Sequence, residues 1–150
     1  MKGKSNVVML LAAVFAALTL FAGCGPEENV SINGSMRFVI GTPTPTVYTV
    51  DLDKVDITEG ALSVIKYLHE TEGLEYTAQT GFLTRVGDLA QDDAAGVYLY
   101  LYTSVPADFD VSVYQETLDY DGQTLTSSGV SVTEMTVEKD CVIYIGTIIF

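Results

Sequence analysis

One stretch of the chain has helical periodicity, and it lies among shorter segments in which apolar and polar residues alternate. The helical spacing predicts a helix over residues 59–71, with Thr58 as its N-cap. Gly73 suits the left-handed position that ends a helix. Only one face of this helix is apolar (Ala61, Leu62, Ile65 and Leu68), so we expect it to cover a sheet.

The alternating segments predict β-strands on both sides of the helix. Residues 46–52 alternate so that Tyr48, Val50 and Leu52 face the core. Asp121-Gly122 predicts a tight turn between strands at 118–120 and 123–126. The other strand candidates are residues 36–41, 75–79, 82–86, 96–104, 111–114 and 137–149. This pattern predicts an α+β domain, a mixed sheet packed on one main helix at about 59–72.

The N-terminal segment has the features of an export signal. Lys2 and Lys4 precede an apolar run over residues 7–22, which is shorter than a bilayer-spanning helix requires. Gly23-Cys24 follows directly and resembles the lipobox of bacterial lipoproteins. The resemblance implies cleavage before Cys24, lipid on its thiol, and a protein anchored to the extracytoplasmic face of the cell membrane. An uncleaved N-terminal anchor helix is the alternative. The expected organisation is a signal peptide (1–23), a tether (24–35) and one domain (36–150).

The charge of the chain limits its partners. The formal net charge is −13, and it would become −15 in the mature chain, because the signal contains two lysines and no acidic residue. An acidic surface of this kind repels nucleic-acid phosphates, so we expect no nucleic-acid binding. Cationic partners are compatible with this charge, although solubility alone also explains it.

The sequence contains no constellation typical of an enzyme. It lacks a nucleophile elbow, a phosphate-binding loop and a dinucleotide fingerprint. His69 is the only histidine, and the acidic pairs around Asp92, Asp108 and Asp119 do not follow the spacing of a calcium loop. We therefore expect a non-enzymatic protein without a catalytic residue, a metal site or a resident cofactor. Cys141, the second cysteine, is expected to be a buried, unreactive strand residue.

Four segments between residues 46 and 144 resemble the transcobalamin-like C-terminal domain, a bacterial domain family of unknown function. The resemblance lies in a helix entry at 57–68, a strand at 81–86, an aromatic strand at 96–102 and a closing turn at 137–144. The chain has no tryptophan in the aromatic strand, and it has Cys141 where the family commonly has glycine. The resemblance implies a β-grasp-like fold and cobalamin, or another corrinoid, as a possible ligand.

Three tyrosines in the aromatic strand form the candidate binding site. Tyr98, Tyr100 and Tyr102 alternate with Leu99 and Leu101, so the rings project from one face and the leucines from the other. If the leucines pack toward the helix, the tyrosines are partly exposed and can contact a small or macrocyclic ligand. Two functions remain open: a ligand-binding lipoprotein, and a surface module that docks a protein or glycan. The alternative for the tyrosines is a purely structural role beneath the segment 106–129.

Overall fold

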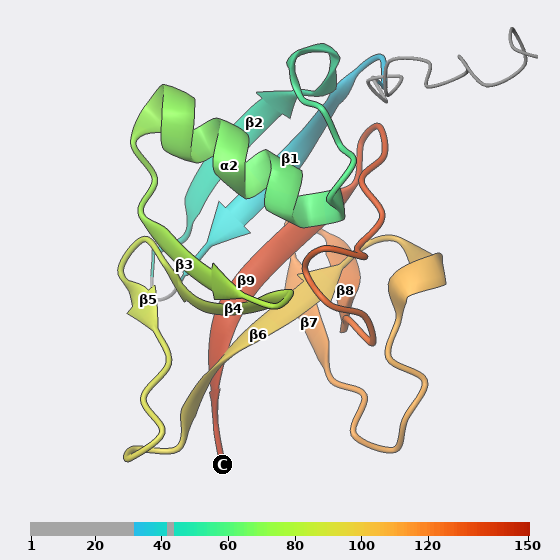
Figure 1. Ribbon diagram of the computed structural model, residues 1–150. Helices are drawn as coiled ribbons and strands as arrows, with labels where there is room; N and C mark the ends of the chain where they lie inside the picture. The colour runs from blue at the N-terminus through green and yellow to red at the C-terminus, as the bar shows by residue number, and fades with distance from the viewer. Residues whose placement is uncertain (1–31, 42–43) are drawn as a thin grey trace, which may run out of the picture.

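A computed structural model describes residues 32–41 and 44–150. Within them, one α-helix and nine strands form an α+β domain that is mostly sheet, as predicted (Figure 1). The predicted signal peptide and Cys24 lie outside the described residues, as does most of the tether. The described residues include no helix that is long and apolar enough to cross a membrane.

Six strands form the main sheet, in the order β2-β1-β9-β6-β8-β7. β1 runs parallel to β9, and the other neighbours are antiparallel. The predicted Asp121-Gly122 turn joins β7 to β8, and both residues have positive φ angles, of 50° and 78°. The strands are β1 (Ser35–Ile40), β2 (Thr46–Asp51), β6 (Val97–Thr103), β7 (Thr117–Tyr120), β8 (Gln123–Ser127) and β9 (Val142–Ile149).

The helix α2 (Gly60–Glu72) lies across β1 and β2 and confirms the predicted helix within one residue at each end (Figure 1). Gly73 ends it with φ 71°, as expected. Thr58 is not the N-cap, because Glu59 occupies that position. The Glu59 side chain makes no capping hydrogen bond, but the Ser63 Oγ accepts a hydrogen bond from the Glu59 backbone N–H at 3.0 Å.

A second sheet, with strand order β3-β4-β5, lies beside α2 on the same side of the main sheet (Figure 1). It is formed by β3 (Tyr76–Gln79), β4 (Phe82–Val86) and β5 (Leu89–Ala90). We call this side of the main sheet the front face. The main hydrophobic core lies between the front face, α2 and the small sheet, and its fully buried side chains include Phe38, Leu52, Val64, Ile65, Val86 and Ile143. Val50 and Leu52 belong to this core and Tyr48 packs against it, which confirms the predicted inward face of β2.

A smaller hydrophobic cluster covers the opposite, rear face. Val39, Leu125, Val142 and Tyr144 are buried there, with Tyr102, Leu118 and Tyr120 packed against them. The Tyr120 and Tyr144 ring centroids are 5.4 Å apart, although two strands separate β7 from β9 in the sheet. Adjacent strands lie about 4.8 Å apart, so a flat sheet would keep these rings much farther from each other. The sheet therefore curls, and the β7–β8 hairpin folds over the rear face, where Asp121 forms an ion pair with Arg37 of β1.

One strand prediction was wrong, and the last predicted strand (137–149) is confirmed only from residue 142 onward. Residues 111–114 form an exposed loop, because Asp110 Oδ1 accepts from the Ser112 N–H at 2.8 Å and Ser112 Oγ accepts from the Tyr114 N–H at 3.1 Å. These local hydrogen bonds bend the backbone away from any neighbouring strand. The last strand begins only at Val142, because the chain first turns at Asp140, which has φ 63°. Two short 3₁₀ helices complete the fold, at Leu52–Lys54 and Pro106–Asp108.

Candidate functional site

The three tyrosines of β6 share the rear face, and the alternating leucines face the main core, as predicted. Leu99 is buried in that core and Leu101 packs against it. Tyr102 lies opposite Tyr144 of β9, and Tyr100 lies opposite Gly146, which leaves the space beside its ring free of a β9 side chain. The rear face of β6 is therefore a row of rings.

The rings of this row differ in their surroundings. Tyr102 lies within the rear cluster, with its ring centroid 5.4 Å from that of Tyr100 and 6.3 Å from that of Tyr144. Burial raises the pKa of Tyr102. Tyr98 packs against Phe150, with a centroid distance of 5.9 Å, and Tyr100 Oη donates to the Tyr114 carbonyl at 3.5 Å. Tyr98 and Tyr100 are half-buried, so part of each ring remains accessible.

A cleft of about 530 Å³ opens on the other side of the same strand. Residues 98–101 of β6 form one wall, residues 81–83 at the start of β4 form a second, and the segment 128–134 forms a third. Phe82 lies at the rim with 71% of its surface exposed. The lining combines apolar side chains with the polar side chains of Gln91, Ser128, Ser131 and Glu134.

Sequence reasoning missed this cleft, because the segment 128–134 reaches it only through the tertiary fold. Gly81 has a weak sequence signal, since it forms a turn with φ 81° directly before the exposed Phe82. Glu134 Oε2 accepts from Ser131 Oγ at 2.9 Å, which fixes one polar edge of the cleft. The arrangement suits non-covalent binding of a ligand that is partly apolar and offers hydrogen-bonding groups.

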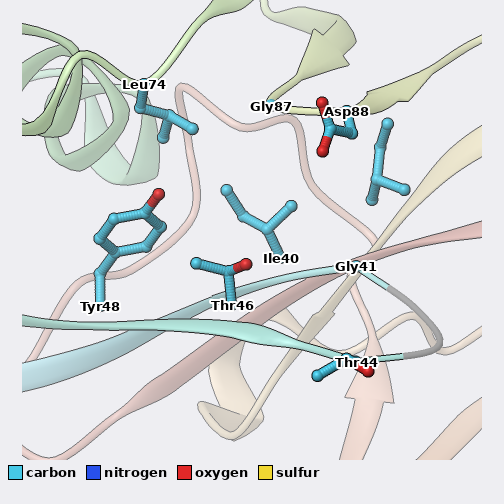
Figure 2. A pocket seen from close by; sticks show the side chains of 9 residues that line it. Ile40, Gly41, Thr44, Thr46, Tyr48, Leu74, Gly87 and Asp88 are labelled. Atoms are coloured by element: carbon cyan, nitrogen blue, oxygen red, sulfur yellow. The ribbon is translucent and has the colours of Figure 1, made fainter.

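A second, smaller pocket of about 180 Å³ lies between β2 and the β4–β5 turn. In Figure 2, Tyr48 and Thr46 rise from β2 toward Leu74 and Asp88, with Ile40 between them. Three of these side chains carry oxygen atoms, and Asp88 supplies a carboxylate. The pocket therefore combines a few apolar side chains with hydroxyl groups and one carboxylate.

The acidic pairs considered for calcium are engaged in local hydrogen bonds. Asp92 Oδ1 accepts from the backbone N–H groups of Ala94 and Ala95, at 3.0 and 3.1 Å. Asp119 Oδ1 accepts from Thr124 Oγ1 at 2.7 Å. Over residues 32–41 and 44–150, no three His, Cys, Asp or Glu side chains are grouped so that they could hold a metal ion.

The two remaining reactive side chains have structural surroundings. His69 Nδ1 lies 2.9 Å from the Leu74 carbonyl oxygen, at the C-terminal end of α2. Cys141 is buried, as expected, but it lies directly before β9 and not within a strand. Burial raises the pKa of its thiol to about 11. A thiol with this pKa is protonated at neutral pH and is a poor nucleophile.

Comparison with known proteins identifies a similar fold. No family model and no curated protein matches the sequence. The structure is similar to that of a "putative metal binding protein" from Ruminococcus gnavus ATCC 29149, with a TM-score of 0.51 and 11% sequence identity. The match covers 79% of this chain and 99% of that chain. At this identity the likeness concerns the fold alone.

Proposed function

We propose that the protein is a non-enzymatic binding module that holds a small ligand in the front cleft, at the extracytoplasmic face of a membrane. The observation that carries the proposal is the cleft of about 530 Å³ between β6, the start of β4 and the segment 128–134. Its volume lies within the range of about 300–1,000 Å³ that is typical of small-molecule sites. Its mixed lining can bury an apolar surface and orient polar groups.

The expected ligand class follows from the resemblance to transcobalamin-like domains. A β-grasp-like arrangement, with a mixed sheet over one helix, is the finer description of the fold that we propose. A corrinoid such as cobalamin would contact the cleft with one part of its surface. Within the cleft, the side chains of Leu99 and Leu101 supply apolar surface from β6. The rings of Tyr98, Tyr100 and Tyr102 lie on the rear face of the same strand and do not line this cleft with their side chains.

Calorimetric titration tests ligand binding. Cobalamin and cobinamide are added to the detergent-solubilised protein, and heat that saturates at micromolar concentration is the expected result. Phe82→Ala should abolish this heat without changing stability, because its side chain is 71% exposed at the rim. Absence of heat with both corrinoids removes the corrinoid as ligand. If Phe82→Ala binds as tightly as the parent protein, the front cleft is not the site.

The second candidate function is docking of a protein partner, and one loop favours it. Val111, Val113 and Tyr114 are 94%, 92% and 78% exposed. Exposed apolar side chains grouped on one loop are typical of an interaction site. Tyr114→Ala should weaken such docking and leave the heat of corrinoid binding unchanged. Phe82→Ala should have the opposite effects, so the two variants distinguish the two functions.

Membrane attachment depends on Cys24 in this proposal. Cys24→Ala should move the protein from the membrane fraction to the soluble fraction and abolish metabolic labelling with a fatty-acid analogue. Cys141→Ala is the matched control, since its thiol is buried in the domain and should receive no lipid. Lipid labelling that persists in Cys24→Ala would contradict lipidation at this residue.

A further inference from the structure

The strand β2 lies at an outer edge of the main sheet. The alternation of its hydrogen bonds to β1 shows which of its backbone N–H and C=O groups face outward. The Leu52 N–H donates to the Gly34 carbonyl at 2.8 Å, so this pair exchanges hydrogen bonds across the β1–β2 ladder. Bonded pairs alternate with non-bonded pairs in an antiparallel ladder. Thr46, Tyr48 and Val50 therefore direct their backbone groups to β1. Val47, Thr49 and Asp51 direct theirs outward, where no strand among residues 32–41 and 44–150 pairs with them.

This edge has little protection against strand addition along most of its length. Its one charged side chain is Asp51 at the last position of β2, and Pro45 lies just before the strand. Residues 46–50 contain no charged side chain and no proline, and the Val47 side chain is 47% exposed. Natural edge strands commonly carry an inward lysine, a proline or a bulge that prevents pairing with another chain. The edge of β2 is thus able to accept an extended segment through backbone hydrogen bonds.

The smaller pocket adjoins this edge on the front face. Side chains of β2 at positions 46 and 48 line it, so their cross-strand neighbours on an added strand would also point to the front. Figure 2 shows Tyr48 and Thr46 on β2, with Leu74 and Asp88 across the pocket. The volume of about 180 Å³ suits a single long side chain.

We propose that the edge of β2 and this pocket together bind an extended segment of a basic protein partner by strand addition, with a lysine or arginine side chain in the pocket. The stem of such a side chain would contact Ile40 and Leu74, and its charge would reach Asp88. Among the described residues, the acids that form ion pairs are Asp121 with Arg37, Asp51 with Lys54 and Glu59 with Lys66, and no ion pair involves Asp88. The net charge of −13 attracts a basic segment over a longer range.

Pairing of β2 with a second copy of this chain is less compatible with the same observations. Such a pair would place Thr46 or Tyr48 of the second copy opposite the pocket, and neither is positively charged. It would also bring together two molecules that each carry −13. A basic partner could form backbone hydrogen bonds with the edge of β2 and also place a positive charge near Asp88.

Fluorescence anisotropy with synthetic peptides tests the proposal on the detergent-solubilised full chain. The probe is a labelled peptide of alternating valine and threonine with one central lysine, and its control carries glutamate in place of lysine. We expect the lysine peptide to bind and the glutamate peptide to bind at least about tenfold more weakly, because its charge would face Asp88. Asp88→Asn should weaken the lysine peptide about two- to fivefold. Asp93→Asn, at another exposed acid, should leave its affinity unchanged.

Backbone methylation of the peptide tests strand addition without altering the protein. N-methyl groups on the amides that would face β2 should abolish binding, and N-methyl groups on the alternate amides should not. Equal loss from both methylation patterns, or equal binding of the lysine and glutamate peptides, would overturn the proposal. Sedimentation experiments could instead reveal a concentration-dependent dimer that is lost in Thr49→Pro. That result would assign the edge of β2 to a second copy of the chain and would also overturn the proposal.

Discussion

Both carboxylate oxygens of Asp108 accept hydrogen bonds from Thr136: Oδ2 from the backbone N–H at 2.6 Å and Oδ1 from Oγ1 at 2.9 Å. Asp108 is only 4% exposed. The Asp108 carbonyl also accepts from the Gly129 N–H at 2.8 Å. Asp108 therefore attaches the short helix after β6 to two points of the segment that leads to β9: its carboxylate binds Thr136, and its backbone carbonyl binds Gly129.

Removal of this carboxylate should destabilise the domain. Asp108→Ala leaves the Thr136 N–H and hydroxyl without their acceptor, and each buried unsatisfied group costs about 1–3 kcal/mol. We expect a loss of about 2–4 kcal/mol in the free energy of unfolding, measured by urea denaturation. Asp110→Ala is the control and should cost less than about 1 kcal/mol, because this half-buried carboxylate binds only Ser112 in the exposed loop that follows it. Equal losses in the two variants would show that the Thr136 contacts are not the cause.

The buried thiol of Cys141 should make stability fall at alkaline pH. Burial raises its pKa to about 11 in the folded state from an ordinary value of 9.0. The folded state therefore retains the proton that the unfolded chain releases above pH 9, and the associated stability is lost as the pH rises toward 11. The loss should reach about 2–3 kcal/mol at pH 11.

Cys141→Ala separates this contribution from the titration of other groups. Burial also raises the pKa of Tyr102 and Tyr144, but both tyrosines remain in the variant, so their contribution cancels in the comparison. The parent protein should lose more stability than the variant between pH 8.5 and 11 in urea denaturation. Parallel pH profiles would show that the thiol has the same pKa in the folded and unfolded chains.

Tyr144 should stabilise the domain through its hydroxyl as well as through its ring. Its Oη donates to the Gly41 carbonyl at 2.6 Å and connects β9 to the end of β1. Tyr144→Phe leaves that carbonyl without this donor, and we expect a loss of about 1–2 kcal/mol in thermal or urea unfolding. Tyr98→Phe is the matched control. It should change the free energy of unfolding by less than about 0.5 kcal/mol, since no hydrogen bond of the Tyr98 hydroxyl is found in the described residues.

Most elements of this fold could be predicted from local patterns. The helical apolar stripe and the glycine at its end identified α2, and Asp121-Gly122 identified the β7–β8 turn, because these signals depend on backbone geometry within a few residues. Residues 111–114 have strand-like composition. The hydrogen bonds that the side chains of Asp110 and Ser112 accept from nearby backbone N–H groups outweigh that propensity, because no neighbouring strand pairs with the segment.

The sites were harder to predict, because they depend on which face of the sheet becomes covered. The alternation in β6 correctly placed Tyr98, Tyr100 and Tyr102 on one face. It could not indicate that the sheet curls and brings Tyr120 close to Tyr144, so that Tyr102 packs against a buried cluster and is partly covered. The front cleft joins residues 81–83 to 128–134, and no local pattern relates segments so far apart in the chain.

Two glycines with similar backbone angles should respond very differently to alanine. Gly60 is the first residue of α2 and Gly73 follows its last residue, with φ 53° and 71°, so alanine is strained at both, by about 1 kcal/mol. A Cβ at Gly73 would meet no atom within 4 Å, whereas a Cβ at Gly60 would lie 2.6 Å from the Met135 carbonyl oxygen and 2.9 Å from that of Thr133. Gly73→Ala should therefore cost about 1 kcal/mol, and Gly60→Ala should cost at least about 3 kcal/mol, because backbone atoms must move. Urea denaturation of the two variants measures the difference. Equal losses in the free energy of unfolding would mean that the backbone of residues 133–135 can move away from the start of α2 at little cost. The close approach of these two segments would then contribute little to the stability of the domain.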